Sequence, residues 1–129
     1  MKINEITEIV IEECIYIHKK LGPGLFESVY EEILVYRLRN RGFEIAQQKA
    51  IPVVFEETKM EIGFRADLII NNKVLIEIKS LNAVPKVAEM QVLTYLRLTG
   101  IQIGLLINFN VQKLVDGITR IANNYVEEN

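Results

Sequence analysis

The sequence has no tryptophan, one cysteine, Cys14, and one histidine, His18. A single cysteine excludes a disulfide within the chain, and no group of cysteines and histidines has the spacing of a zinc site. This usage is compatible with a reducing compartment, so we expect a cytoplasmic protein.

The chain also lacks a long uncharged apolar stretch at its start. Residues 1–21 carry four glutamates among their apolar positions: Glu5, Glu8, Glu12 and Glu13. We therefore expect neither a signal peptide nor a membrane span. Because no repeat, low-complexity tract or linker interrupts the 129 residues, we expect one domain covering residues 1–129.

An excess of positive charge is missing as well. The 15 lysines and arginines are outnumbered by 17 aspartates and glutamates, which gives a formal net charge of −2. Proteins that bind nucleic acid through bulk charge are basic. Any contact with phosphate must therefore be local, through a metal ion or a few basic side chains.

Apolar residues recur at helical spacing in two N-terminal stretches, separated by Gly22-Pro23-Gly24. The first helix is predicted from Asn4 to about Lys20, with an inner side of Ile6, Val10, Cys14, Ile17 and Leu21. The second is predicted from Leu25 or Phe26 to Arg41, with Gly42 as its stop and an inner side of Val29, Tyr30, Ile33, Leu34 and Leu38. 

A third helix is predicted from Pro85 to about Thr99, because proline suits a helix start and Gly100 ends the pattern. Its predicted inner side consists of Val87, Met90, Leu93, Thr94 and Leu98.

The other apolar stretches favour strands. Phe43 to Phe55, interrupted by Gln47-Gln48-Lys49 and Pro52, predicts one bent strand or two short ones near a sheet edge. The continuous apolar run from Ile101 to Phe109 predicts a strand buried on both faces. The tail from Val111 fits either a helix or a short edge strand. Together these stretches predict an α/β fold with a mixed sheet covered by helices.

Residues 63–80 predict a β-hairpin around Asn71-Asn72-Lys73. Side chains alternate along a strand, so one face is predicted to contain Phe64, Ala66, Leu68, Ile70, Val74, Ile76 and Ile78. Keeping this face intact pairs Ile70 with Val74, Leu68 with Ile76 and Ala66 with Ile78, and requires a three-residue connection or a bulge.

The same register sets Asp67 directly opposite Glu77 on the other face, with Cβ atoms roughly 5 Å apart. Two facing carboxylates repel unless a cation lies between them, and their oxygens suit Mg²⁺ or Mn²⁺. Lys79 shares that face and could orient a water or stabilise charge on a phosphate. An isolated Glu-x-Lys in a strand is more often only a solvated face; the aspartate in register favours a metal site.

Other polar residues have functional and ordinary interpretations. Glu27 begins the second helix, where the macrodipole favours a carboxylate, but it could also contact the site. Gln91 and Tyr95 lie one helical turn apart and could contact phosphate, or form an ordinary helix surface. His18 lies near the predicted end of the first helix, and Arg37, Arg39 and Arg41 lie near the predicted end of the second. Positive charge is favourable at a helix C-terminus, so we do not expect His18 to act as a base or the arginines to bind phosphate.

Taken together, Gly24-x-x-Glu27-x-x-Tyr30, Asp67, Glu77-x-Lys79 and Gln91-x-x-x-Tyr95 resemble the GxxExxY protein family. That family is a branch of the PD-(D/E)xK, or restriction-endonuclease-like, nuclease superfamily. The likeness extends from Leu21 to Phe109, with Ala66 in place of the proline that often precedes the aspartate.

The resemblance implies a restriction-endonuclease-like core, a four-stranded mixed sheet flanked by helices in αβββαβ order. It implies that Asp67, Glu77 and the Ile78 carbonyl ligate Mg²⁺ or Mn²⁺ and that Lys79 assists the attacking water. Glu27 matches the helical glutamate of the catalytic set. Gln91 and Tyr95 match the Gln-x-x-x-Tyr helix of RecB-type members, which implies substrate binding.

The leading hypothesis is therefore a metal-dependent nuclease that hydrolyses DNA or RNA. The alternative is a catalytically silent module that keeps the fold and binds nucleic acid or a protein partner. A homo-oligomer is a third possibility, and no membrane partner is expected. Substrate, endo- or exonuclease mode, the number of metals and the pathway stay open.

Overall fold

The computed structural model describes residues 1–128, apart from the side chain of Ile62. Along the chain its elements are α1 (Ile3–Leu21), α2 (Glu27–Asn40), β1 (Ile45–Phe55), β2 (Thr58–Ile70), β3 (Val74–Lys79), α3 (Val87–Thr99), β4 (Ile103–Asn108), the 3-10 helix η1 (Leu114–Gly117) and β5 (Ile118–Ala122).

The strands form one sheet in the order β1-β2-β3-β4-β5. Neighbours are antiparallel except β3 and β4, which are parallel and joined through α3. The predicted α/β class and mixed sheet are confirmed, but the predicted strand number is wrong: the sheet has five strands rather than four. The added strand is β5, which resolves the ambiguous tail as an edge strand.

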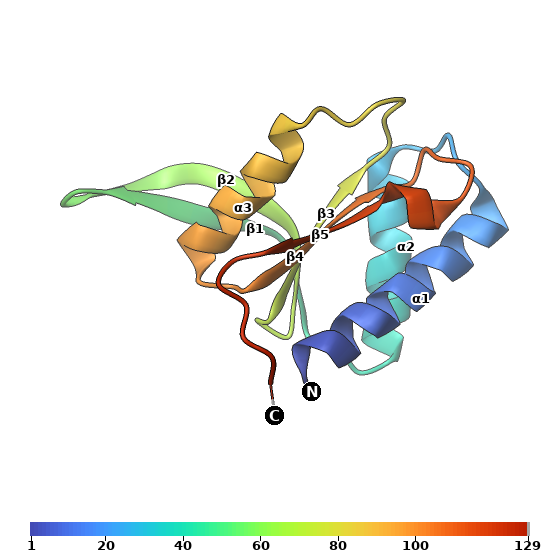
Figure 1. The fold of residues 1–129 in the computed structure, drawn as a ribbon, viewed down its shortest axis with the longest axis horizontal. Helices are drawn as coiled ribbons and strands as arrows, with labels where there is room; N and C mark the ends of the chain where they lie inside the picture. Colours follow the sequence, from blue (N-terminus) through green and yellow to red (C-terminus); the bar gives the residue numbers. More distant parts are fainter. Residues whose placement is uncertain (129) are drawn as a thin grey trace.

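Helices cover both faces of the sheet (Figure 1). One core cluster joins α1 and α2 to the sheet and includes Leu68, Ile70 and Ile76. A second cluster joins α3 to the opposite face and includes Leu75 and Leu106. The sheet is therefore buried from both sides, as expected when strands alternate their apolar side chains toward two layers.

The first two helices follow their predicted periodicity closely. In α1, Ile6, Val10 and Cys14 are fully buried. In α2, Tyr30, Leu34 and Leu38 are fully buried, but Val29, predicted to face inward, is 37% exposed. Leu21 was also predicted inward and is 42% exposed at the end of α1.

Contacts between α1 and α2 involve the basic residues near the end of α2. Arg37 and Arg41 both form ion pairs with the buried carboxylate of Glu13 on α1. The hydrogen bond from Arg37 is the main cause that lowers the pKa of Glu13. His18 is buried beside this helix pair, with its Nε2 2.8 Å from the carbonyl oxygen of Val111. 

The prediction for the inner side of α3 is wrong. Val87 and Met90 are 54% and 67% exposed, whereas Ala88, Val92 and Leu96 are buried against the sheet. The helix lies close to β4, because a Cβ added at Gly104 would come within 2.9 Å of the Val92 Cγ1 atom. Because Gly104 has no side chain, the side of α3 that contains Val92 can pack closely against β4.

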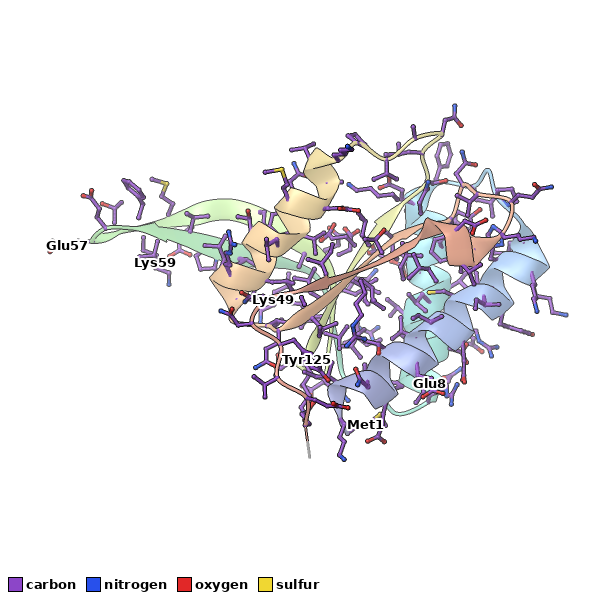
Figure 2. All side chains as sticks on the ribbon, in the orientation of Figure 1. Met1, Glu8, Lys49, Glu57, Lys59 and Tyr125 are labelled. Carbon is purple, nitrogen blue, oxygen red and sulfur yellow. The ribbon has the colours of Figure 1, made fainter. Side chains whose placement is uncertain are left out.

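The predicted buried strand is confirmed as β4, in which every residue from Ile103 to Asn108 is buried. β1 is a single strand with an irregularity between Ile51 and Val53, which agrees with the predicted bend. The β1–β2 hairpin projects well beyond the body of the protein (Figure 1). Figure 2 shows Glu57 and Lys59 near its far end and Lys49 near its base, beside α3.

The β2–β3 hairpin has the predicted register near its turn. Leu68 pairs with Ile76 and Ile70 pairs with Val74. The connection has three residues, of which Asn71 and Asn72 have φ of 50° and 56°. Asparagine tolerates this left-handed conformation better than most residues.

The prediction that Phe64 and Ala66 lie on the same face of β2 as Leu68 and Ile70 is wrong. Ala66 belongs to the cluster beneath α3, and Phe64 packs against that same cluster, whereas Leu68 and Ile70 face α1 and α2. The β2–β3 ladder ends at Leu68 and Ile76, so the predicted pairing of Ala66 with Ile78 does not form. The strands open at this point, and the gap between them is where the two acidic side chains lie.

Candidate active site

Asp67 and Glu77 lie just beyond the last β2–β3 pair, Leu68 with Ile76. The Asp67 N–H donates a hydrogen bond of 3.1 Å to Glu77 Oε1. The Ile78 N–H donates a hydrogen bond of 2.8 Å to Asp67 Oδ2. Each carboxylate therefore takes the place of a ladder partner on the opposite strand, which holds the two acids close together.

The surroundings of Glu77 disfavour its ionised form. The residue is 7% exposed, and its pKa is raised from 4.5 to about 8. Burial is the largest cause, followed by the negative charge of Asp67, while the positive charge of Lys79 acts in the opposite direction. A buried carboxylate beside another gains from a proton or a cation between them.

The main-chain carbonyl of Ile78 faces the same gap. The next carbonyl, that of Lys79, accepts a hydrogen bond of 2.9 Å from the Phe109 N–H at the β4 side. Successive carbonyls of a strand point to opposite sides, so the Ile78 carbonyl points toward β2 and Asp67. 

This donor set fits a hard divalent ion. Two carboxylates and a carbonyl offer only oxygen, and Mg²⁺ commonly uses one or two carboxylates while keeping positions for water and phosphate. Within residues 1–128, no group of three or more His, Cys, Asp and Glu side chains is arranged to hold a metal ion. The third oxygen at this site would accordingly come from the main chain.

Lys79 is the last residue of β3 and is partly buried. Its positive charge lowers the pKa of Glu77, against the larger effects of burial and of Asp67. In the part of the chain that the structure describes, Lys79 forms no ion pair within 4.0 Å. The ammonium is therefore available for contacts with a water molecule or a phosphate.

Tyr95 of α3 also lies near the two acids. Burial raises its pKa first, and the negative charges of Glu77 and Asp67 raise it further. Its ring stacks on Phe64, with ring centroids 3.6 Å apart and planes 7° apart. Gln91, one turn earlier, is exposed, and its amide makes no hydrogen bond among the described residues.

Glu27 is the first residue of α2 and is exposed. It lines an open hollow of about 680 Å³ that also includes Ser80, Asn82 and Asn110. No hydrogen bond joins Glu27 to Asp67 or Glu77 among residues 1–128. The structure thus brings together Asp67, Glu77 and Ile78, with Lys79 and Tyr95 nearby, and leaves Glu27 and Gln91 outside this hydrogen-bonded group.

Sequence reasoning missed two residues that the structure connects to this site. Glu31 of α2 is 7% exposed, and Gln48 of β1 donates hydrogen bonds to both Glu31 and Asp67. The sequence indicates a role for these two residues only weakly: Glu31 follows Glu27 by one helical turn, and Gln47-Gln48 is an adjacent pair of amides inside a strand. Only the approach of α2 to β1 joins them.

The family model of the PD-(D/E)XK nuclease superfamily matches residues 4–121. The chain belongs to this superfamily, and its fold is the restriction-endonuclease-like α/β arrangement. Among solved structures, the crystal structure of SSO0001 aligns with 94% of this chain and 79% of its own, at 21% identity and a TM-score of 0.47. A comparison with curated proteins gave no match.

None of the helices described within residues 1–128 is both long enough and apolar enough to cross a membrane.

Proposed function

We propose that this protein is a nuclease that hydrolyses phosphodiester bonds of DNA or RNA and requires Mg²⁺ or Mn²⁺. Membership of a nuclease superfamily supports this proposal. The observation that carries it is the pairing of Asp67 with buried Glu77, whose pKa is raised to about 8. Two acids held together at this cost are expected where a cation binds.

Asp67, Glu77 and the Ile78 carbonyl would hold the ion, which when bound supplies positive charge to the scissile phosphate. Lys79 orients the attacking water and stabilises negative charge that develops on the phosphate oxygens. Tyr95 and Gln91 contact the substrate from α3. Glu27 acts from the hollow beside Ser80, where the substrate strand passes the end of β3.

We also propose the family branch, the domain extent, the compartment and the partner that the sequence implies. Gly24, Glu27 and Tyr30 support membership of the GxxExxY branch. The protein acts as a single domain over residues 1–129, in the cytoplasm, on a nucleic-acid partner that it contacts locally. The net charge of −2 supports local contact rather than binding through bulk charge.

The test is a cleavage assay on labelled single- and double-stranded DNA and RNA with Mg²⁺ or Mn²⁺. Wild-type protein is compared with Asp67→Asn and Lys79→Ala, and with Lys113→Ala as a control that removes an exposed lysine outside the site. Cleavage by the wild type and the control, lost in both site variants, is the expected result.

Equal cleavage in all four proteins would identify a contaminating nuclease and contradict the proposal. Wild-type protein that binds nucleic acid but cleaves none of the substrates would favour the catalytically silent module. Calorimetry with Mn²⁺ separates these outcomes further, because the nuclease is expected to lose divalent-ion binding in Asp67→Asn and to keep it in Lys113→Ala.

A further inference from the structure

A side-chain amide of β1 bridges two carboxylates from different elements. Gln48 Nε2 lies 2.9 and 3.1 Å from the two carboxylate oxygens of Glu31 and 3.1 Å from Asp67 Oδ1. An amide nitrogen has two hydrogens, whereas ionised carboxylates only accept. The nitrogen must therefore face both acids, and one N–H can serve each of them.

We propose that Gln48, anchored by Glu31, is a positioning residue that holds Asp67 in the orientation needed to bind the divalent ion. This inference rests on the proposed nuclease function and assigns roles to two residues outside the motifs. It also makes Glu31, one turn after Glu27, the carboxylate of α2 that acts on the site through hydrogen bonds.

The anchor at Glu31 is well held. The residue is 7% exposed, and its Oε2 accepts a second hydrogen bond of 2.8 Å from Gln47 Nε2. Gln47 also donates to Glu32 and has no hydrogen bond to Asp67. The neighbouring amides thus share one anchor, but only Gln48 extends the connection to the site.

The backbone of β1 is distorted at the bridging residue. Gln48 has a φ of 50°, in the left-handed region that side-chain-bearing residues rarely adopt. The register pairs Gln47 with Leu68 and Lys49 with Ala66, so Gln48 lies opposite Asp67. Such strain persists where surrounding contacts hold it, and it gathers at functional sites.

The bridge fixes Asp67 at a second point. Asp67 Oδ2 accepts from the Ile78 N–H and Oδ1 accepts from Gln48. With one partner on each oxygen, rotation of the carboxylate breaks at least one hydrogen bond. Removing groups that orient metal ligands typically costs about 10- to 100-fold in metal affinity.

The experiment compares Gln48→Met with Gln47→Met. Both remove an amide that contacts Glu31 and keep the side-chain length, but only the first disconnects Asp67. The first measurement is hydrogen exchange of the Ile78 amide by NMR in metal-free protein, because this amide reports directly on the Asp67 orientation. The second is Mn²⁺ affinity by calorimetry.

In Gln48→Met, we expect the Ile78 amide to exchange at least about tenfold faster and Mn²⁺ affinity to fall about 10- to 100-fold. In Gln47→Met, both quantities are expected to stay within about threefold of wild type. Gln48→Asn keeps an amide and tolerates the left-handed backbone, but its side chain is one methylene shorter; it is expected to behave like Gln48→Met.

Equal Ile78 exchange in the two methionine variants, with equal Mn²⁺ affinity, would overturn the positioning role. Wild-type protein that binds no Mn²⁺ would instead contradict the proposed function. In that case, the Ile78 exchange rates alone support or overturn the claim that Gln48 holds Asp67, because they need no metal.

Discussion

Replacing Glu77 by glutamine is expected to remove a pH-dependent loss of stability from the metal-free protein. The side chain is buried beside Asp67, and its pKa is raised from 4.5 to about 8. Glutamine keeps the oxygen that accepts the Asp67 N–H but carries no charge to bury. The substitution therefore isolates the electrostatic cost of this carboxylate.

The direction in which wild-type stability changes with pH follows from the number of protons that the folded and unfolded states bind. Below about pH 4.5 both the folded and the unfolded protein keep this proton, so the group has no effect on stability. Between about pH 4.5 and about pH 8, the unfolded chain releases a proton that the folded protein retains, so wild-type stability falls as pH rises. Above about pH 8 both states are ionised and the loss is complete.

The size of the loss follows from the same pKa values. Each pKa unit corresponds to about 1.36 kcal/mol, so a rise from 4.5 to about 8 corresponds to a total on the order of 5 kcal/mol. A typical domain has an unfolding free energy of about 5–15 kcal/mol, so this loss is readily measured.

The assay is urea denaturation in EDTA, followed by circular dichroism, at steps from about pH 4 to about pH 9. Wild type and Glu77→Gln share all other titrating groups, so the pH dependence of the difference between their unfolding free energies reports the titration of Glu77 together with its interaction with Asp67. Mg²⁺ added at the upper end should stabilise the wild type and not the variant. A difference that stays constant across this pH range would refute the reasoning.

Three further predictions concern the site and its support. Lys79→Ala is expected to lower the cleavage rate by about 100-fold or more while Mn²⁺ affinity stays within a few-fold, measured by initial rates and calorimetry. Mn²⁺ affinity should rise by up to about tenfold per pH unit toward pH 8 and then level, because binding displaces the proton that Glu77 retains below its raised pKa. Calorimetry in buffers of different ionisation enthalpy counts that proton, and none released near pH 6 would contradict the prediction. Gly104→Ala places a Cβ 2.9 Å from Val92 Cγ1 and should cost about 1–3 kcal/mol of unfolding free energy, measured by urea denaturation; an unchanged midpoint would show that α3 is not packed this closely.

Most of the β2–β3 hairpin could be predicted because strand patterns are local. Side chains alternate with a period of two, so a slip of one residue would turn the whole apolar set of Leu68, Ile70 and Ile76 to the wrong face. The same constraint predicted that Asp67 and Glu77 would lie opposite each other. That register holds only as far as Leu68 and Ile76; beyond this pair, hydrogen bonds from the Asp67 and Ile78 N–H groups to the two carboxylates keep the acids close together.

The side of α3 that packs inward could not be predicted in the same way. Its apolar residues surround much of the helix, so periodicity alone left more than one inner side open. The close approach at Gly104 favours the side with Ala88, Val92 and Leu96. That choice depends on a residue of β4, beyond the helix itself.

The sequence by itself determined the α/β class, most of the inner row of α1, the doubly buried β4 and the register of the β2–β3 hairpin near its turn, because each depends on the spacing of neighbouring residues. The tertiary structure decided the edge strand β5, the change of face at Ala66 and the link from Glu31 through Gln48 to Asp67. These depend on how helices and strands distant along the chain meet in space, and no local pattern encodes the distance between two such elements.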